Sequence, residues 1–171
     1  MRRKEARLTI LGIDPGLATL GWGVIRQEGQ KLKLVQYGAL STPAGVALPH
    51  RLRSLFIGVQ QLMQTYAPDE VAFEELFFSK NVTTGMAVSA ARGAALVAAA
   101  EKNDRLFEYT PMQIKQAVAG YGKAEKRQVQ QMVKMLLGLD EIPRPDDAAD
   151  ALAAAITHAH TGASAAQFQM R

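Results

Sequence analysis

Short apolar runs dominate the first quarter of the chain and predict three β-strands. The strands are expected at residues 8–13, 22–26 and 33–40. A Pro-Gly pair turns the chain after the first strand, and a polar segment, 27–30, separates the second from the third. Consecutive strands joined by short turns pair with each other, so this region is expected to form an antiparallel meander.

Beyond residue 45, apolar residues recur every three or four positions, which predicts helices with single strands between them. The expected helices lie at residues 52–66, 83–102, 111–119, 123–137 and 146–160, and the expected strands lie at 70–73 and 106–109. This order predicts an α/β fold with a five-stranded mixed sheet that helices cover on both faces. The polar, alanine-rich tail beyond Gly162 is expected to be frayed.

Length and composition indicate one globular domain. The 171 residues are 48% hydrophobic and 21% charged, and neither an internal repeat nor a long linker divides them. We expect a single domain over 1–171, with an ordered core at about 8–160 and flexible termini. The absence of cysteine excludes disulfides, thiolate metal sites and cysteine nucleophiles.

Charge favours a polyanionic partner without establishing one, since the net charge is +4. The basic start of the chain does not lead into a signal peptide, because Asp14 ends the apolar stretch that follows. Arg92 interrupts the richest apolar segment, 86–100, so we expect no membrane segment. A cytoplasmic location is predicted.

Four acidic residues fall where predicted elements end or begin. Asp14 follows the first strand and Glu74 the fourth, and side chains at the carboxyl ends of neighbouring parallel strands line one crevice. Glu75 is an equally good candidate for the second position until the end of the strand is known. Asp147 and Asp150 are three residues apart and therefore share a helical face. All four carboxylates are expected to converge.

Converging carboxylates require a cation, because two of them roughly 4 Å apart repel by about 4 kcal/mol at an effective dielectric constant of ~20. Oxygen ligands without cysteine favour Mg²⁺ or Mn²⁺, and paired ions suit phosphodiester hydrolysis. Simpler interpretations remain open at this stage. Asp14 is also a typical turn residue beside Pro15, and Asp146, Asp147 and Asp150 are typical of a helix start.

Basic and aromatic residues near these acids are candidates for DNA contacts. The basic candidates share a predicted helical region: Lys115, Lys123, Lys126 and Arg127. A basic stripe of this kind is also typical of a solvated face. Phe77, Phe78 and Lys80 follow Glu74, where an aromatic ring can stack on an unpaired base or pack in the core. His158 and His160 are two residues apart, which favours a core or surface role over metal binding.

Taken together, the motifs resemble the RuvC family of Holliday-junction resolvases. The matching segments are 12–16 (GIDPG), 21–25 (GWGVI), 73–78 (FEELFF), 91–93 (ARG), 124–126 (AEK) and 147–153 (DAADALA). They occur in order from about residue 8 to residue 160, which is nearly the whole chain.

This resemblance implies a ribonuclease-H-like fold and a homodimer that cuts four-way DNA junctions by paired symmetric nicks. It implies two Mg²⁺ ions per active site, which Mn²⁺ can replace, and partnership with the RuvA and RuvB branch-migration proteins. By motif, the catalytic acids and metal ligands are Asp14, Glu74, Asp147 and Asp150; Lys115 and Lys126 serve the scissile region; and Phe77 meets junction bases. Asp146 departs from the motif, as an extra carboxylate that either competes for metal or caps the helix.

Two other functions are compatible with these residues. One is another ribonuclease-H-like nuclease that acts on branched DNA or on RNA–DNA hybrid, and the other is a junction-binding protein without catalysis. An actin-like ATPase is disfavoured, because such proteins need two lobes and a second Asp-Gly-rich loop, for which this chain is too short.

Overall fold

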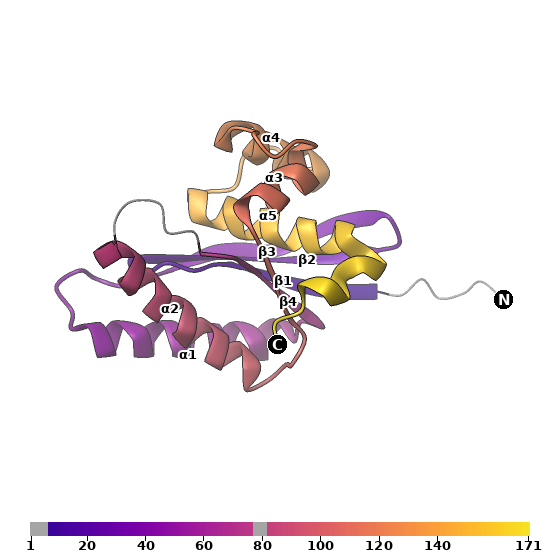
Figure 1. Cartoon of the computed structure of the whole chain (residues 1–171). Coiled ribbons are helices and arrows are strands. Elements are labelled where there is room, and N and C mark those ends of the chain that lie inside the picture. The colour runs from indigo at the N-terminus through magenta and orange to yellow at the C-terminus, as the bar shows by residue number, and fades with distance from the viewer. Residues whose placement is uncertain (1–6, 77–81) are drawn as a thin grey trace.

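The computed structural model describes residues 7–76 and 82–171. Phe77, Phe78 and Lys80 lie outside the described residues, as does the N-terminal end that the sequence predicts to be flexible. The chain forms a single mixed sheet with helices on both of its faces (Figure 1).

The sheet has five strands in the order β3-β2-β1-β4-β5. The strands are β1 (Arg7–Asp14), β2 (Thr19–Glu28), β3 (Lys31–Ser41), β4 (Glu70–Glu74) and β5 (Leu106–Tyr109). The first three form the predicted antiparallel meander, whereas β4 pairs in parallel with both β1 and β5. The predicted five-stranded mixed sheet is therefore confirmed.

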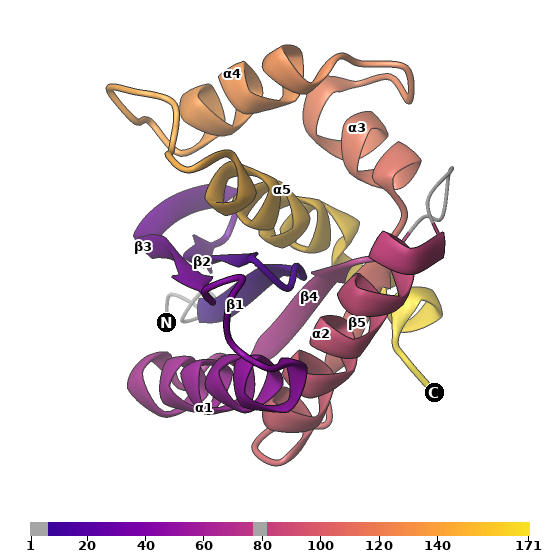
Figure 2. The same ribbon diagram turned by 90° about the vertical axis from the view of Figure 1, so that its left-hand side faces the viewer.

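Helices lie in layers above and below this sheet (Figure 2). Two of them, α1 (Leu48–Tyr66) and α2 (Val82–Ala100), cover one face. The other face carries α5 (Asp146–Thr161), on which α3 (Pro111–Ala119) and α4 (Lys126–Leu136) pack in turn. The α/β fold class with both faces covered is confirmed. Among the described residues, no helix is long and apolar enough to cross a membrane.

The alternation of strand side chains decides which residues face α5. In β1, Leu11 and Ile13 pack with the α1–α2 layer, while Ile10 packs with the α5 layer. In β4, Phe73 belongs to the α1–α2 side and Ala72 to the α5 side. Because successive side chains point to opposite faces, the residues that end these two strands, Asp14 and Glu74, both point to the α5 side.

Glycines in the two central strands allow α5 to approach the sheet very closely. A Cβ atom at Gly12 would lie 2.0 Å from the carbonyl oxygen of Ala151, and one at Gly21 would lie 1.9 Å from that of Asp147. Both distances are far below any van der Waals contact. Glycine in a strand interior is typical of such close approach, and here it brings the start of α5 against the end of β1.

A buried polar network ties the far end of α5 to the start of β4. His158 is hydrogen-bonded through Nδ1 to the hydroxyl of Tyr109 at 2.6 Å and through Nε2 to Glu70. Glu70 also accepts a hydrogen bond from Nε of Arg105 at 2.9 Å. Burial raises the pKa of Glu70, but its bonds to Arg105 and His158 outweigh this effect and lower it. The core role predicted for His158 is thus confirmed.

Some predicted boundaries are wrong: α1 and β2 begin earlier than expected, at Leu48 and Thr19, and α4 begins at Lys126 and not at residue 123. Glu125 forms a capping box with Gln128, in which each side chain bonds to the backbone of the other residue. Lys123 therefore lies in the connection before the helix, where it does not share the helical spacing expected of it.

The C-terminal tail is ordered, where the sequence predicts a frayed end. Residues Gly162–Phe168 form a 3₁₀ helix, η1, and the ring of Phe168 lies 5.0 Å from that of Tyr109. The backbone N–H of Met170 then donates to the carbonyl of Leu106 at 2.9 Å, beside an antiparallel bridge between Gln169 and Phe107. Two isolated apolar residues, Phe168 and Met170, anchor the tail without giving a periodic pattern.

We predict that Gly21→Ala destabilises the protein by about 1–3 kcal/mol, because the added methyl group overlaps the Asp147 carbonyl and forces α5 away from the sheet. Urea unfolding monitored by circular dichroism measures this change. Gly45→Ala is the matched control, since a Cβ atom at Gly45 would meet nothing within 4 Å. Equal midpoints for the two variants would contradict the close approach of α5.

Candidate functional site

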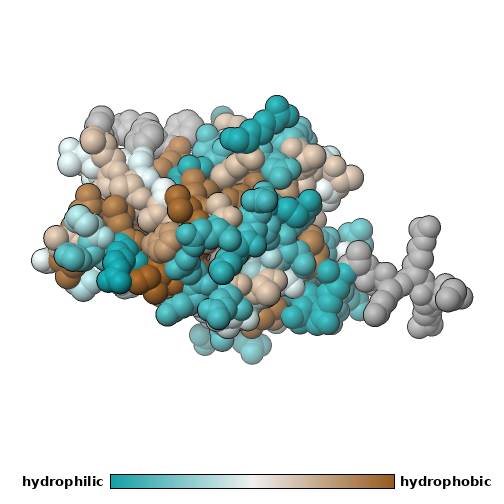
Figure 3. All heavy atoms as spheres, turned by 90° about the horizontal axis from the view of Figure 1, so that it is seen from below, coloured by the Kyte–Doolittle hydropathy of each residue, from teal (hydrophilic) through white to brown (hydrophobic). Residues whose placement is uncertain are grey.

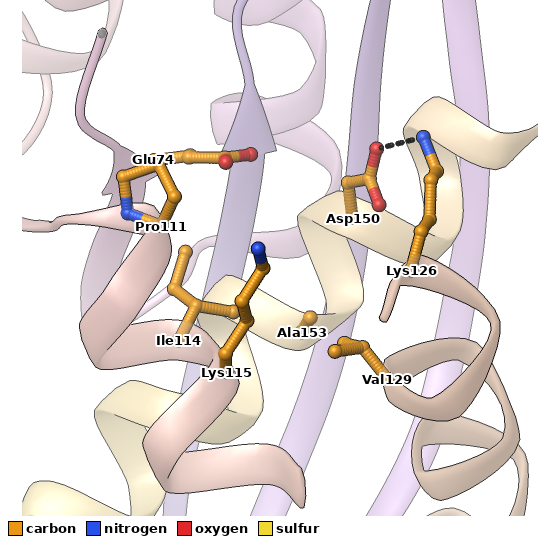
Figure 4. A pocket seen from close by; sticks show the side chains of 8 residues that line it. All are labelled: Glu74, Pro111, Ile114, Lys115, Lys126, Val129, Asp150 and Ala153. Atoms are coloured by element: carbon orange, nitrogen blue, oxygen red, sulfur yellow. Dashed lines mark hydrogen bonds and ion pairs between the residues drawn. The ribbon is translucent and has the colours of Figure 1, made fainter. Parts of the chain in front are cut away.

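An open cavity of 280 Å³ lies where β4, α3, α4 and α5 meet (Figure 4). Its charged lining consists of two acids and two bases, Glu74, Asp150, Lys115 and Lys126. The carboxylates of Glu74 and Asp150 and the ammonium of Lys115 point toward the same space. Pro111, Ile114, Val129 and Ala153 form the apolar remainder of the wall.

Asp14 and Glu74 meet because their strands are neighbours in the sheet. The parallel register pairs Gly12 with Ala72 and Ile13 with Phe73, so Asp14 and Glu74 come at the same level. Burial raises the pKa of Asp14, and the charges of Glu74, Asp150 and Asp147 and a hydrogen bond with Glu74 raise it further. These effects favour a protonated Asp14 carboxyl that donates a hydrogen bond to Glu74.

The surroundings of Glu74 and Asp150 also raise the pKa values of these two carboxyls. Burial and the charge of Asp150 raise the pKa of Glu74, although Asp14, Lys126 and Lys115 act in the opposite direction. Burial likewise raises the pKa of Asp150, despite its bond to Lys126. Glu75, the alternative candidate, lines a different cavity with Arg92 and Glu108. Strand alternation thus selects Glu74 for the cavity beside α5.

Lys126 partly neutralises this cluster of acids. Its Nζ donates to Oδ2 of Asp150 at 3.0 Å and lies 3.9 Å from Oδ2 of Asp146. Burial alone would lower the pKa of Lys126, but the bond to Asp150 and the charges of Asp146 and Asp14 outweigh it and raise the pKa. The ammonium occupies a position at which a cation would also be attracted.

The candidate ligands are carboxylate oxygens, the atom type that hard divalent cations prefer. Burial and mutual repulsion raise their pKa values, and a cation would relieve that repulsion. Their arrangement is not yet that of a bound ion. Within residues 7–76 and 82–171, no three such side chains are placed to hold a metal.

The structure brings most of the predicted site residues together, but not all. Asp147 lies beside Gly21 and acts on Asp14 through its charge, and Lys115 lines the cavity. Arg127 points elsewhere and lines a separate cavity with Tyr121. Phe77, Phe78 and Lys80 fall outside the described residues, so their predicted DNA contacts stay predictions.

Several features that position the site have weak signals in the sequence. Gly12 lies inside the first predicted apolar strand, a pattern that indicates close backbone approach, whereas Gly21 lies just before the second predicted strand and carries no such signal. The Glu70–His158 contact joins residues 88 positions apart, and no local pattern reveals it. Of the two roles left open for Asp146, capping is not observed, because the N-cap residue is Pro145 and no side chain caps this helix.

The chain is similar over most of its length to one known protein family. Residues 10–158 match the family model of the crossover junction endodeoxyribonuclease RuvC. The chain is 58% identical to the protein of that name from Rubrobacter xylanophilus, over 93% of this chain and 89% of the relative. The Thermus thermophilus RuvC structure superposes with a TM-score of 0.84 at 40% identity, covering 90% and 95% of the two chains. A second structure shows that Thermus protein with Holliday junction substrate, at TM-score 0.84, 39% identity and 90% and 93% coverage.

We predict that Asp14→Asn stabilises the cation-free protein at alkaline pH. Because the pKa of Asp14 is raised on folding, the parent loses stability as the pH rises through that pKa, and asparagine removes this loss. In EDTA, thermal unfolding from pH 6 to pH 9 should show a shallower decline for the variant. Each kcal/mol recovered corresponds to roughly 2–4 °C.

The matched control is Asp140→Asn, which removes the same charge from an exposed loop position. It should follow the pH dependence of the parent. Parallel curves for all three proteins would show that Asp14 is not held in a repulsive cluster.

Proposed function

The chain belongs to the RuvC family of crossover junction endodeoxyribonucleases, and we propose that it resolves four-way DNA junctions by paired symmetric nicks. The observation that carries this proposal is the group of mutually repelling acids, Asp14, Glu74 and Asp150, beside the Lys115–Lys126 wall of one open cavity. The same combination supports phosphodiester hydrolysis, since it pairs cation-binding oxygens with phosphate-binding ammonium groups.

In this proposal, Asp14, Glu74, Asp147 and Asp150 hold two Mg²⁺ ions, which Mn²⁺ can replace. When bound, the ions supply activation of water and charge stabilisation at the leaving 3′-oxygen. Asp14 gives up the proton that it shares with Glu74, so both carboxylates become ligands. Cation binding is thereby coupled to proton release and strengthens as the pH rises.

The basic residues hold the DNA strand. Lys115 points into the cavity beside Glu74 (Figure 4), which supports its assignment to the scissile phosphate. Lys126 serves the same phosphate once it has left Asp150. We assign Lys123 and Arg127 to phosphates farther along the strand, and Phe77, Phe78 and Lys80 to the unpaired bases at the junction.

We infer a homodimer, which the symmetry of the proposed substrate and an exposed apolar face of α2 support. Two symmetric nicks need two active sites at a fixed spacing, which a two-fold dimer supplies. Met86, Ala90, Gly93 and Val97 follow helical spacing; the side chains of Met86 and Val97 are 68% and 57% exposed, and nothing lies within 4 Å of a Cβ atom at Gly93. Apolar residues gather on the side of the molecule that α1 and α2 cover (Figure 3).

The wider setting is inferred from the family. We propose that RuvA and RuvB deliver the junction, that the protein acts in the cytoplasm where this DNA lies, and that residues 1–171 form one nuclease domain. Two alternatives are kept for testing: another ribonuclease-H-like nuclease that cuts hybrid or other branched DNA, and a junction-binding protein without catalysis.

We predict that the parent nicks a synthetic immobile four-way junction in Mg²⁺ and leaves linear duplex and RNA–DNA hybrid intact. Asp14→Asn should bind the junction near normally and lose nicking by at least about a hundredfold, because one carboxylate ligand becomes a weak amide donor. A denaturing gel measures nicking and a mobility shift measures binding.

The substrates and variants of this experiment separate the candidate functions. Cleavage of the hybrid in preference to the junction would favour the hybrid nuclease. Binding of the junction with no cleavage in Mg²⁺ or Mn²⁺ would favour the binding protein. Unimpaired nicking by Asp14→Asn would mean that the proposed metal ligands are wrong.

We also predict that Val97→Glu converts the dimer to a monomer, because it introduces a buried, unpaired charge at the proposed interface. Light scattering after size exclusion measures the mass, and the junction gel should show single nicks replacing paired ones. Met135→Glu is the control: Met135 is 69% exposed on α4, on the opposite side of the sheet. A dimeric Val97→Glu protein would place the interface elsewhere.

A further inference from the structure

We propose that Asp146 is a second docking carboxylate for Lys126, and that it takes up the lysine ammonium when a divalent cation displaces it from Asp150. Lys126 would thus move between two acids on one helix, and Asp146 would be a positioning residue for the reaction. This inference rests on the metal site of the proposed function.

The geometry places both acids around the same ammonium. Asp146 and Asp150 are four residues apart at the start of α5, so they lie one above the other on one helical face. Lys126 Nζ lies 3.0 Å from Oδ2 of Asp150 and 3.9 Å from Oδ2 of Asp146. A small rotation of the lysine side chain transfers it from one carboxylate to the other.

Asp146 is held in place to receive the ammonium. Its Oδ1 accepts a hydrogen bond from Nη1 of Arg144 at 3.0 Å, which leaves Oδ2 on the side of Lys126. Its side chain is 47% exposed, compared with 25% for Asp150, so its charge is better solvated without a partner. Of the two carboxylates, Asp146 is therefore the less costly one to leave without a lysine partner.

Cation binding favours the transfer. A divalent ion at Asp150 and an ammonium 3.0 Å from the same carboxylate repel each other, which weakens the contact of Lys126 with Asp150. Without Asp146, the displaced ammonium would lose its ion pair altogether. With Asp146, it keeps a carboxylate partner and stays next to the cavity in which the phosphate is proposed to bind.

Two simpler roles for Asp146 fit the structure less well. The helix is not capped by Asp146, because Pro145 is the N-cap residue. Direct metal binding is disfavoured, since the described lining of the cavity includes Asp150 but not Asp146, and Arg144 already occupies one oxygen of Asp146. Direct metal binding is nevertheless a distinct outcome of the test below.

The test measures Mn²⁺ binding to the DNA-free protein by electron paramagnetic resonance of the free ion, with no dependence on cleavage. Asp146→Asn should weaken Mn²⁺ binding by about twofold to fivefold, the range expected for loss of one exposed ion pair. Asp140→Asn, which removes an equal charge from an exposed position in the preceding loop, should change binding by less than about 1.5-fold.

A double-mutant cycle with Lys126→Met shows how Asp146 acts. Lys126→Met alone should tighten Mn²⁺ binding, because it removes the competing ammonium. In that background, Asp146→Asn should have no more effect than Asp140→Asn, since there is no lysine left to dock.

Each other outcome has a definite meaning. If Asp146→Asn weakens binding equally with and without Lys126, Asp146 acts on the ion directly and the docking role is wrong. If Asp146→Asn behaves like Asp140→Asn in the parent background, the docking role is also wrong. If the parent binds no Mn²⁺ and Asp14→Asn changes nothing, the metal site itself is wrong, and the proposed function fails before this inference is reached.

Discussion

The close approach of α5 to the central strands is the constraint on which the site depends. Two acids arrive at the end of the sheet on β1 and β4, and the others arrive on α5, so their separation is set by how near the helix lies to the strands. Gly12 and Gly21 remove the side chains that would hold the helix away. At the far end of α5, the buried contact between His158 and Glu70 fixes its position along β4. The packing that stabilises the domain therefore also forces like charges together.

The raised pKa values of the acids reflect the electrostatic repulsion that this arrangement creates. Burial and repulsion raise the pKa of Asp14 and of Glu74, and Lys126 supplies a temporary counter-charge at Asp150. Without a cation, such a site is least stable at the pH values at which it binds a cation best. Ionised carboxylates are the form that binds the metal, and they are also the form that repels. A lysine that can pair with either of two acids reduces the repulsion between carboxylates and leaves the cavity open to a cation. Lys126 lies between Asp150 and Asp146 in this way.

The sequence was sufficient for the fold and for much of the site, because both depend on local patterns. Alternating and helical periodicities gave all five strands and the five α-helices, and the ends of strands located Asp14 and Glu74. What it missed depends on contacts between distant segments or on caps. The start of α4 is one example, because Glu125 caps the helix in a capping box with Gln128 and the helix begins at Lys126, not at residue 123. The bonds of Lys126 to Asp150 and of His158 to Glu70 join elements whose packing no short motif records.

The ordered tail has a consequence for the outer strand next to β4. A parallel strand such as β5 offers its unpaired backbone groups to any extended chain that comes near, and exposed sheet edges of this kind promote aggregation. Gln169 and Met170 occupy part of that edge, with Phe168 packed beside them on Tyr109. The last few residues thus protect part of the β5 edge, and removing them would expose its backbone groups to pairing with another chain.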